Sequence, residues 1–262
     1  VISVREAWFR YEKDSKDILC GMNFDVHAGE LTCIVGGNGA GKTTALMTAA
    51  GVFAPYRGKV KYRGKPISTF RKDKGSAGKI GVLVQNPLCC FVMDSVAEEL
   101  EATAKAYKLP RSGIEEVIDI MQLQSVLGSN PYDISGGELQ RAAIAKLLLP
   151  EPEVIFLDEA TKGMDAFFKA EFGALLRRLA ARGTAIVLVS HDIEFCAEFA
   201  DRCAMFFNGT VIAEGTPQEV FLGNSFYTTS ACRISRGIIP DALTSEQVID
   251  YANRCERKKN DA

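Results

Sequence analysis

Three short segments of the chain combine glycines, a lysine and carboxylates in patterns that suit phosphate chemistry. The first is the run Gly36-Gly37-Asn38-Gly39-Ala40-Gly41-Lys42-Thr43, followed by Thr44. Its four glycines remove side chains, so backbone N–H groups at the start of a helix can converge on a phosphate. Lys42 is expected to reach the β- and γ-phosphate oxygens, and the Thr43 hydroxyl to bind Mg²⁺. A glycine-rich turn that only joins a strand to a helix is the disfavoured alternative, because both flanking segments fit a phosphate loop.

Asp158 and Glu159 form the second segment, at the end of the apolar run Val154–Leu157. Ligands collect at the carboxyl ends of strands in open α/β sheets. Two adjacent carboxylates there are unfavourable without a cation, so we expect Mg²⁺ nearby. Asp158 would bind the metal directly or lie one layer behind it, and Glu159 would polarise an attacking water. Taken alone, a strand ending in two solvated acids would be the better interpretation, but the glycine-rich run reverses that preference.

Ser135-Gly136-Gly137-Glu138 is the third segment, and it supports two interpretations. Ser135 and Glu138 have the spacing of a capping box at the start of a helix. The two glycines also leave the helix end bare, so its free N–H groups and its dipole can bind a phosphate. Because the chain already has one phosphate cradle, a second anion-binding helix end indicates a dimer in which each copy covers the nucleotide of the other.

The elements that must position these segments alternate between strand and helix. Apolar, β-branched runs predict strands at Met22–Val26, Leu31–Val35, Ile80–Val84, Val154–Leu157, Ala185–Val189 and Arg202–Phe207. Helical spacing predicts helices at residues 41–50 and 165–182, and Gly183 should end the second one. Strands that alternate with helices imply an α/β fold with a mainly parallel sheet.

Residues 86–150 carry helix-start signals in place of strand signals. Capping-box spacings begin at Ser95, Ser112 and Ser135. We therefore expect a helical subdomain inserted in an α/β nucleotide-binding domain that spans residues 1–225.

The end of the chain is expected to form a small helical appendage over residues 226–262. It follows a hairpin turn signal at Asn208-Gly209 and a short helix start at Thr216, and a longer helix should begin at Thr244.

Composition excludes several classes of function. Lys plus Arg number 31 and Asp plus Glu 33, so the chain offers no excess of positive charge for nucleic acid. No apolar run approaches the ~18 residues that cross a bilayer, and the first residues lack the layout of a signal peptide. We therefore expect a soluble, cytoplasmic chain.

The eight cysteines include no C-x-x-C pair, which suits reduced core thiols. The chain also begins without methionine on a strand-like segment, as a domain of a longer polypeptide would, although a trimmed chain would look the same.

The motifs, taken in chain order, resemble those of the nucleotide-binding domain of ABC ATPases. They are the glycine-rich run, Gln85, Ile134–Arg141 and Val154–Glu159, and Ile134–Arg141 is the most specific of them. The resemblance implies a P-loop NTPase fold of the ABC ATPase type, with a mainly parallel core sheet, an antiparallel β portion, an inserted helical subdomain and a small C-terminal appendage. It also implies an ATP hydrolase that uses Mg²⁺.

The same resemblance implies roles for four further residues. Gln85 would touch Mg²⁺ and the attacking water and relay contact to a membrane partner. Asp165 would contact the opposite copy of the domain, and His191 would contact the γ-phosphate. Tyr11 would stack on adenine, although Phe9 or Trp8 could do so instead.

Three positions depart from the common pattern of this family. They are Glu138 in place of the frequent Gln, Ala160 in place of Pro, and Lys162-Gly163-Met164 in place of Ser-Gly-Leu. None of them removes a group that the chemistry needs. Because Glu159 and His191 are both present, we expect a site that is competent for hydrolysis.

A narrower resemblance concerns Gln85-Asn86-Pro87 and Phe226-Tyr227-Thr228-Thr229, which look like the ATPase subunits of energy-coupling-factor (ECF) importers of vitamins and transition-metal ions. In that family two ATPase domains, sometimes fused in one polypeptide, lie under a membrane scaffold. The expected partners are therefore a second ATPase domain and integral membrane subunits, at the cytoplasmic face of the membrane. The apolar run Leu88–Met93 either packs inside or forms a groove wall for a scaffold helix.

The alternative function is a non-transport ABC ATPase that acts on nucleic acid or ribosomes. Such proteins usually insert a long coiled coil, a zinc module or a basic linker. Only 48 residues lie between Gln85 and Ile134, without heptads and with balanced charge. A third possibility, a module that binds ATP without hydrolysing it, conflicts with the intact Glu159.

Overall fold

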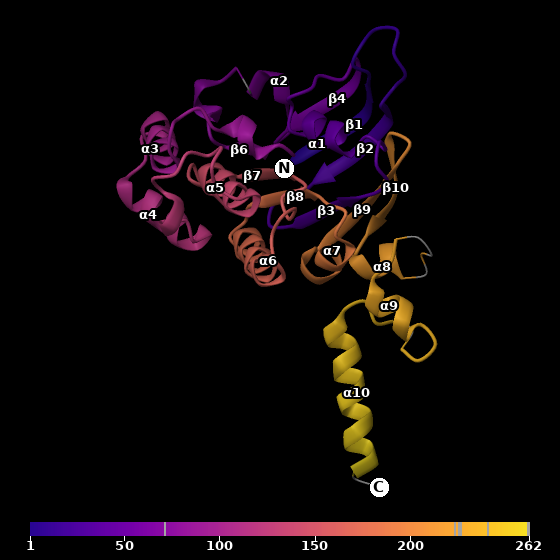
Figure 1. The fold of residues 1–262 in the computed structure, drawn as a ribbon. Helices are drawn as coiled ribbons and strands as arrows, with labels where there is room; N and C mark the ends of the chain where they lie inside the picture. The colour runs from indigo at the N-terminus through magenta and orange to yellow at the C-terminus, as the bar shows by residue number, and fades with distance from the viewer. Residues whose placement is uncertain (71, 223, 225–226, 240, 261–262) are drawn as a thin grey trace.

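Two β-sheets carry the architecture of the computed structural model, which describes residues 1–70, 72–222, 224, 227–239 and 241–260 (Figure 1). One sheet has six strands in the order β10-β9-β3-β8-β7-β6, and the other has four antiparallel strands in the order β2-β1-β4-β5. The strands are β1 (Ile2–Phe9), β2 (Leu19–Val26), β3 (Leu31–Val35), β4 (Arg57–Tyr62), β5 (Lys65–Pro66), β6 (Ile80–Leu83), β7 (Val154–Asp158), β8 (Ala185–Val189), β9 (Arg202–Phe207) and β10 (Thr210–Gly215).

Helices cover both faces of the six-stranded sheet. They are α1 (Lys42–Ala49), α2 (Ile67–Phe70), α3 (Val96–Tyr107), α4 (Arg111–Met121), α5 (Gly136–Leu148), α6 (Ala166–Ala181), α7 (Ile193–Phe199), α8 (Pro217–Phe221), α9 (Ser230–Ser235) and α10 (Ser245–Asn260). Short 3₁₀ turns lie at Lys74–Ser76, Pro87–Cys90 and Gln124–Val126. One hydrophobic core joins α1 to both sheets, and the other joins the opposite face of the six-stranded sheet to α3 to α7. Because both faces of the six-stranded sheet are covered, a ligand can reach this sheet only at its edges.

Three central strands of the large sheet are buried along their whole length. Every residue of β3, β7 and β8 is buried, as their unbroken apolar runs predict. The pairs β3–β8, β3–β9, β6–β7 and β7–β8 are parallel, and β9–β10 is antiparallel. The expected mainly parallel sheet with an antiparallel portion is confirmed, and the carboxyl ends of β3, β6, β7 and β8 share one edge.

The sequence signals missed β4 and misplaced one helix start. In Arg57–Tyr62 only Val60 and Tyr62 are buried, so the strand has too little apolar alternation to be recognised. The capping box expected at Ser112 is wrong, because α4 begins one residue earlier, after Pro110, and has no side-chain cap. Proline fixes the backbone angle at this helix entry, but no capping side chain accepts a hydrogen bond from the first N–H groups of α4.

Other helix boundaries agree with their signals. Ser135 and Glu138 form the reciprocal capping box of α5, and Ser95 caps α3. Gly183, just after α6, has φ +101° in the left-handed region that ends helices. Residues 86–150 contain helices and 3₁₀ turns but no strand.

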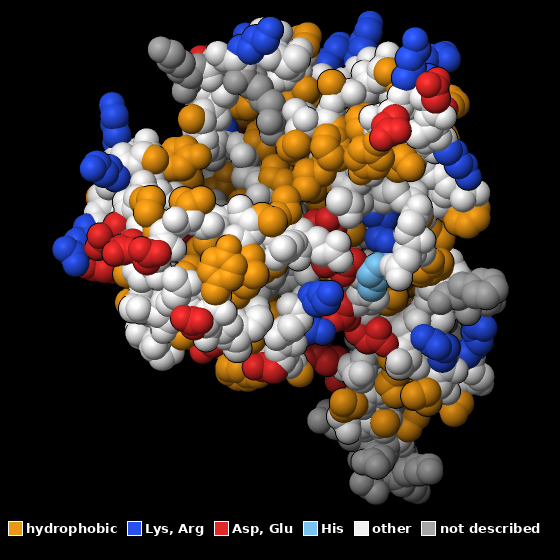
Figure 2. Space-filling model, turned by 45° about the horizontal axis from the view of Figure 1, so that its top comes forward, with side chains coloured by type: hydrophobic (Ala, Val, Ile, Leu, Met, Phe, Trp, Pro, Cys, Tyr) orange, Lys and Arg blue, Asp and Glu red, His pale blue; other side chains and the backbone are white. Residues whose placement is uncertain are grey.

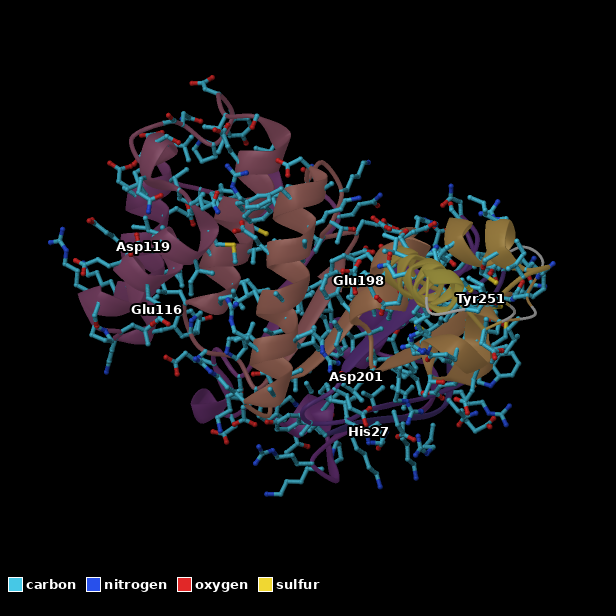
Figure 3. The ribbon with its side chains drawn as sticks, turned by 90° about the horizontal axis from the view of Figure 1, so that it is seen from below. His27, Glu116, Asp119, Glu198, Asp201 and Tyr251 are labelled. Carbon is cyan, nitrogen blue, oxygen red and sulfur yellow. The ribbon has the colours of Figure 1, made fainter. Side chains whose placement is uncertain are left out.

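The last described helix, α10, extends away from the rest of the molecule (Figure 1). Figure 3 looks along this helix from below, and it is the start of α10 that lies beside the segment carrying Glu198 and Asp201. A hollow of about 510 Å³ between α7, α8 and α10 is lined by both of these residues and by Glu246 and Asp250. None of the described helices is long and apolar enough to cross a membrane.

The apolar run Leu88–Met93 divides between core and surface. Phe91 is buried, whereas Val92 is 81% exposed and Met93 41%. The Val92 and Met93 N–H groups both donate to Oε2 of Glu99, each at 2.9 Å. The core interpretation therefore holds for Phe91, and a carboxylate holds the exposed Val92–Met93 pair in place. The groove-wall interpretation stays a prediction.

Glu99 of α3 is a buried carboxylate with a cationic partner on α5. Its side chain is 3% exposed, and Lys146 Nζ donates to its Oε1 and to the Cys90 carbonyl. Burial raises the pKa of Glu99, but the bonds from Lys146 and from the two backbone N–H groups outweigh it and lower the pKa overall. The carboxylate thus connects α3, α5 and the Val92–Met93 loop.

We predict that Lys146→Met lowers the free energy of unfolding by about 3 kcal/mol, because it leaves a charged carboxylate buried without its partner. Urea denaturation followed by circular dichroism measures the change. Arg111→Met is the matched control, since it breaks the exposed Arg111–Glu115 pair and should cost no more than about 1 kcal/mol. Equal losses in the two variants would contradict the prediction.

Candidate functional site

The glycine-rich loop turns from β3 into the N-terminus of α1. A Cβ at Gly36, where φ is +152°, would lie 2.2 Å from the carbonyl oxygen of Phe206, so only glycine fits. Gly41 precedes α1 with φ +100°, also in the left-handed region, and supplies no side-chain cap. The first turn of α1 contains no acidic residue. These features leave the first N–H groups of the helix available to an anion.

Lys42 is buried inside the loop. Its Nζ donates to the carbonyl oxygens of Gly36 at 2.9 Å and Gly37 at 3.0 Å, and lies 3.4 Å from Nε2 of His191. Burial lowers the pKa of Lys42, and the charges of Glu159 and Asp158 oppose that shift. An ammonium has three N–H donors, of which the loop carbonyls take two, so the third is available to a phosphate oxygen in competition with the longer contact to His191.

Asp158 ends β7 directly beneath Thr43. The Thr43 hydroxyl donates to Asp158 Oδ2 at 2.8 Å, and Oδ1 of the same carboxylate is buried without a partner among the described groups. Burial raises the pKa of Asp158, although the Thr43 bond and the charge of Lys42 oppose it. A buried, unsatisfied carboxylate oxygen beside a hydroxyl offers the oxygen ligands that Mg²⁺ prefers, so these two residues fit a metal ion.

Glu159 adopts a left-handed backbone conformation with φ +56°, uncommon for a residue other than glycine. Its N–H donates to the Val189 carbonyl at 2.9 Å, which joins the end of β7 to the end of β8. Its Oε1 lies 3.1 Å from Nε2 of His191. Burial raises the pKa of Glu159, whereas His191 and Lys42 act in the opposite direction. A carboxylate with a raised pKa beside a histidine is a candidate proton acceptor.

One cavity of about 320 Å³ joins most of the expected site residues. Its lining includes Tyr11, Asn38, Gly39, Gly41, Lys42, Thr43, Thr44, Gln85, Glu159 and His191. Gly36, Gly37 and Ala40 belong to the same loop but do not line the cavity. Figure 2 shows basic, acidic and histidine side chains together in one hollow, below a broad hydrophobic area of the surface.

Tyr11 is the aromatic residue that lines this cavity, and Phe9 and Trp8 do not. Tyr11 is 61% exposed, and its hydroxyl lies 3.0 Å from the Thr44 hydroxyl of α1. Phe9 stacks on Phe53 with 5.1 Å between ring centroids. Tyr11 makes edge contacts with Phe9 and Phe53, and of the three aromatic candidates it is the one that lines the cavity.

Ser135, Gly136, Gly137 and Glu138 lie at the start of α5 and do not line the cavity. Ser135 and Gly136 are exposed. Gly137 packs closely on the loop before α6, since a Cβ there would lie 3.0 Å from the Gly163 carbonyl oxygen. Within one chain, the serine–glycine end of α5 and the loop that carries Lys42 therefore lie on different surfaces.

Asp165, expected to contact a second copy, caps α6 by accepting from the Phe168 N–H at 2.8 Å. One turn later, Lys169 donates to Oδ2 of Asp192 at 2.6 Å. Asp192 follows His191 and also caps α7. The sequence analysis missed the Lys169–Asp192 pair, which ties α6 to the segment that carries His191, because no motif spacing marks it.

Phe226 lies outside the described residues. Of the remaining residues in that segment, Thr228 is buried and Thr229 caps α9. Tyr227 lies against the phosphate loop, since a Cβ at Gly37 would be 3.5 Å from its hydroxyl.

A larger cavity of about 490 Å³ lies between the ends of α4, α5 and α6. It contains none of the expected site residues, and its Arg63 is already paired with Glu153 at 2.7 Å. The smaller cavity at the carboxyl ends of the strands is therefore the better candidate for chemistry.

Comparisons with known proteins identify the family and the fold. The family model described as ABC transporter matches residues 19–162. An ABC transporter ATP-binding protein of Bacillus thuringiensis subsp. konkukian is 39% identical over 95% of this chain and 46% of its own length. The energy-coupling factor transporter ATP-binding protein EcfA of Methanocaldococcus jannaschii is 33% identical over 84% of this chain and 81% of its own length.

Among solved structures, CbiO1 of Clostridium perfringens, described as part of the ABC transporter complex CbiONQ, superposes with a TM-score of 0.76. It is 29% identical and covers 92% of this chain and 96% of its own. The chain spans about half the length of the Bacillus relatives that it matches. The expected P-loop fold of the ABC ATPase type is confirmed.

We predict that Lys169→Met lowers the kcat of ATP hydrolysis about fivefold and leaves the KM for ATP within about twofold, because the segment that carries His191 loses a charge-assisted hydrogen bond. Steady-state phosphate release measures both constants. Arg177→Met is the matched control, since it breaks the ion pair with Asp201 elsewhere on α6. In a His191→Ala background, Lys169→Met should add nothing. A fivefold loss that persists there would contradict action through His191.

Proposed function

Because this chain belongs to the ABC transporter family of ATPase domains, we propose that it binds and hydrolyses ATP as one of two paired domains that drive a membrane transporter. The observation that carries the proposal is that two groups of expected ATP-binding residues lie on different surfaces of one chain. Lys42, Glu159 and His191 surround a cavity, whereas Ser135 and its glycines lie on another surface. A complete site then needs a second copy to supply its helix end.

In this proposal the loop N–H groups and Lys42 bind the β- and γ-phosphates. Tyr11 stacks on the adenine and is held by its bond to Thr44. Thr43, Gln85 and Asp158 would hold Mg²⁺, which supplies charge neutralisation at the phosphates. Asp158 fits that role because one of its buried oxygens has no other partner in the described structure.

Glu159 orients the attacking water and accepts its proton. Its raised pKa and its place 3.1 Å from His191 suit a proton acceptor whose charge is balanced by a neighbour. His191 also lies 3.4 Å from Lys42, so it can meet the γ-phosphate that Lys42 binds. The pair joins the group that activates water to the group that senses the phosphate.

Closure of the dimer is the step that would move membrane subunits. ATP shifts the pair toward the closed state only if it binds that state better than the open one. Ser135 and Gly136 are exposed and Asp165 lies nearby at the start of α6, so an arriving copy can reach all three. Hydrolysis removes the γ-phosphate that bridges the copies and reopens the pair.

The finer proposal is an ECF-type importer of a vitamin or a metal ion, peripheral to the cytoplasmic face of the membrane. The likeness to EcfA and CbiO1 supports it. The exposed Val92 and Met93 follow Gln85 closely in sequence and offer an apolar contact for a helix of a membrane scaffold. The alternative, action on nucleic acid, is not supported by an excess of positive charge, because the chain has 31 basic and 33 acidic residues.

We also propose the domain limits expected from the sequence. Residues 1–225 form the nucleotide-binding domain, residues 86–150 form its helical subdomain, and residues 226–262 form the appendage. The junction between residues 225 and 226 lies outside the described residues.

Glu159→Gln should reduce ATP turnover by at least about 100-fold, because the proton acceptor is lost while the shape of the site is kept. The variant should accumulate as an ATP-bound dimer, detected by size-exclusion chromatography with Mg-ATP. Glu101→Gln, a change at an exposed residue of α3, is the control and should behave as the wild type. Unchanged hydrolysis in Glu159→Gln would refute the assigned role.

Asp substitutions at both Val92 and Met93 should abolish co-purification of membrane proteins from detergent extracts and leave ATP-driven dimerisation intact, because charge opposes burial of the loop against an apolar helix. Mass spectrometry identifies the captured proteins. Ile212→Asp on β10 is the control at another exposed apolar residue. Retention of the same membrane proteins by the double variant would exclude this docking surface.

A further inference from the structure

The first turn of α5 places a carboxylate against the hydroxyl that is expected to meet the γ-phosphate. Ser135 Oγ donates to Glu138 Oε2 at 2.6 Å, and the Ser135 N–H donates to the same oxygen at 2.9 Å. The Glu138 N–H in turn donates to Ser135 Oγ at 3.3 Å. Both hydrogen-bonding atoms of Ser135 that could meet an anion are therefore committed to Glu138.

A serine hydroxyl has one proton to donate. While Ser135 gives that proton to Glu138, its oxygen presents only lone pairs, which repel a phosphate oxygen. Binding of the γ-phosphate in trans must therefore first break the bond between the Ser135 hydroxyl and the carboxylate. A carboxylate is a stronger acceptor than a neutral amide, so a Gln at this position would release the proton more readily.

The charge of Glu138 opposes the anion as well. Bonds from the Ser135 hydroxyl and N–H lower the pKa of Glu138, so the side chain is ionised at neutral pH. The charge of Arg141, one turn later, also lowers this pKa, but Arg141 lies over the Phe168 ring at 5.0 Å and forms no ion pair with Glu138 in the described structure, so it compensates the carboxylate only in part. A negative charge in the first turn offsets part of the positive potential that a helix N-terminus offers to a phosphate.

We propose that Glu138 weakens the ATP-bound dimer by retaining the Ser135 proton and repelling the incoming γ-phosphate, and so makes closure more readily reversible. The proposal rests on the proposed function, in which Ser135 of one copy meets the ATP held by another. It makes Glu138 a residue that determines affinity for the triphosphate without contributing to the chemical step.

The chain contains a matched control for the helix cap itself. At the start of α8, Thr216 and Glu219 form the same reciprocal box, in which the Thr216 N–H and hydroxyl donate to Glu219 Oε2 at 2.7 and 3.1 Å. Gln also completes such a box. Glu219→Gln therefore repeats the change in cap chemistry at a helix end that carries none of the expected ATP-binding residues.

The experiment compares Glu138→Gln with Glu219→Gln, each in the Glu159→Gln background that blocks turnover. Sedimentation velocity with Mg-ATP gives the dimer dissociation constant at low and high salt. We expect Glu138→Gln to lower that constant about five- to tenfold at low ionic strength, with a smaller gain in 0.5 M salt, because part of the effect is charge repulsion. Glu219→Gln should leave it unchanged, and both variants should melt within about 3 °C of their parent.

A second comparison isolates the proton from the charge. In a Ser135→Ala background the hydroxyl is gone, so Glu138→Gln should retain only the salt-sensitive part of its gain. If the Glu159→Gln parent dimerises with ATP and Glu138→Gln is equal to it or weaker, the inference is overturned. If neither protein dimerises with ATP at any concentration, the proposed function fails.

Discussion

Parallel pairing of the buried strands is the constraint on which the site depends. Because β3, β7 and β8 run the same way and in register, their carboxyl ends bring Gly36, Asp158 and the segment before His191 to one edge. The positions of these residues are therefore set by the strands and do not depend on loops folding against each other. The full burial of these strands makes the edge rigid, since a shift of one residue would expose apolar side chains and bury polar ones.

The structure also buries several ionisable side chains. Lys42, Asp158 and Glu99 are each nearly inaccessible to water, and two of them, Lys42 and Asp158, have pKa values shifted toward neutrality by burial. The phosphate loop and the end of β7 thus hold groups whose charges are only partly compensated within the chain. Glu99 is compensated by Lys146, which marks it as structural and separates it from the charges available to a ligand.

Sequence reasoning succeeded where local chemistry and local structure coincide. Gly36, Gly39 and Gly41 have positive φ values within the phosphate loop itself, and the caps of α5 and α6 depend on side chains within one turn. It failed for pairs that only the fold brings together. Lys169 and Asp192 lie 23 positions apart on different helices, and no spacing rule joins them.

The burial of individual side chains in a short apolar run was equally hard to predict from the adjacent residues. Phe91 and Val92 are adjacent and similarly apolar, yet one is in the core and the other in solvent. The difference comes from the carboxylate of Glu99, which draws the Val92 and Met93 amides inward and leaves the side chains outside. A residue seven positions away thus decides what a short apolar run presents to the surface.

The left-handed backbone of Glu159 has a consequence for how this protein responds to selection. A glutamate with φ +56° is strained by about 1–3 kcal/mol, and glycine or asparagine would relieve that strain. Selection for heat resistance alone would therefore favour glycine or asparagine at this position. Mutant libraries that aim at higher stability should leave Glu159 unchanged, because relieving its backbone strain would remove the proposed catalytic carboxylate.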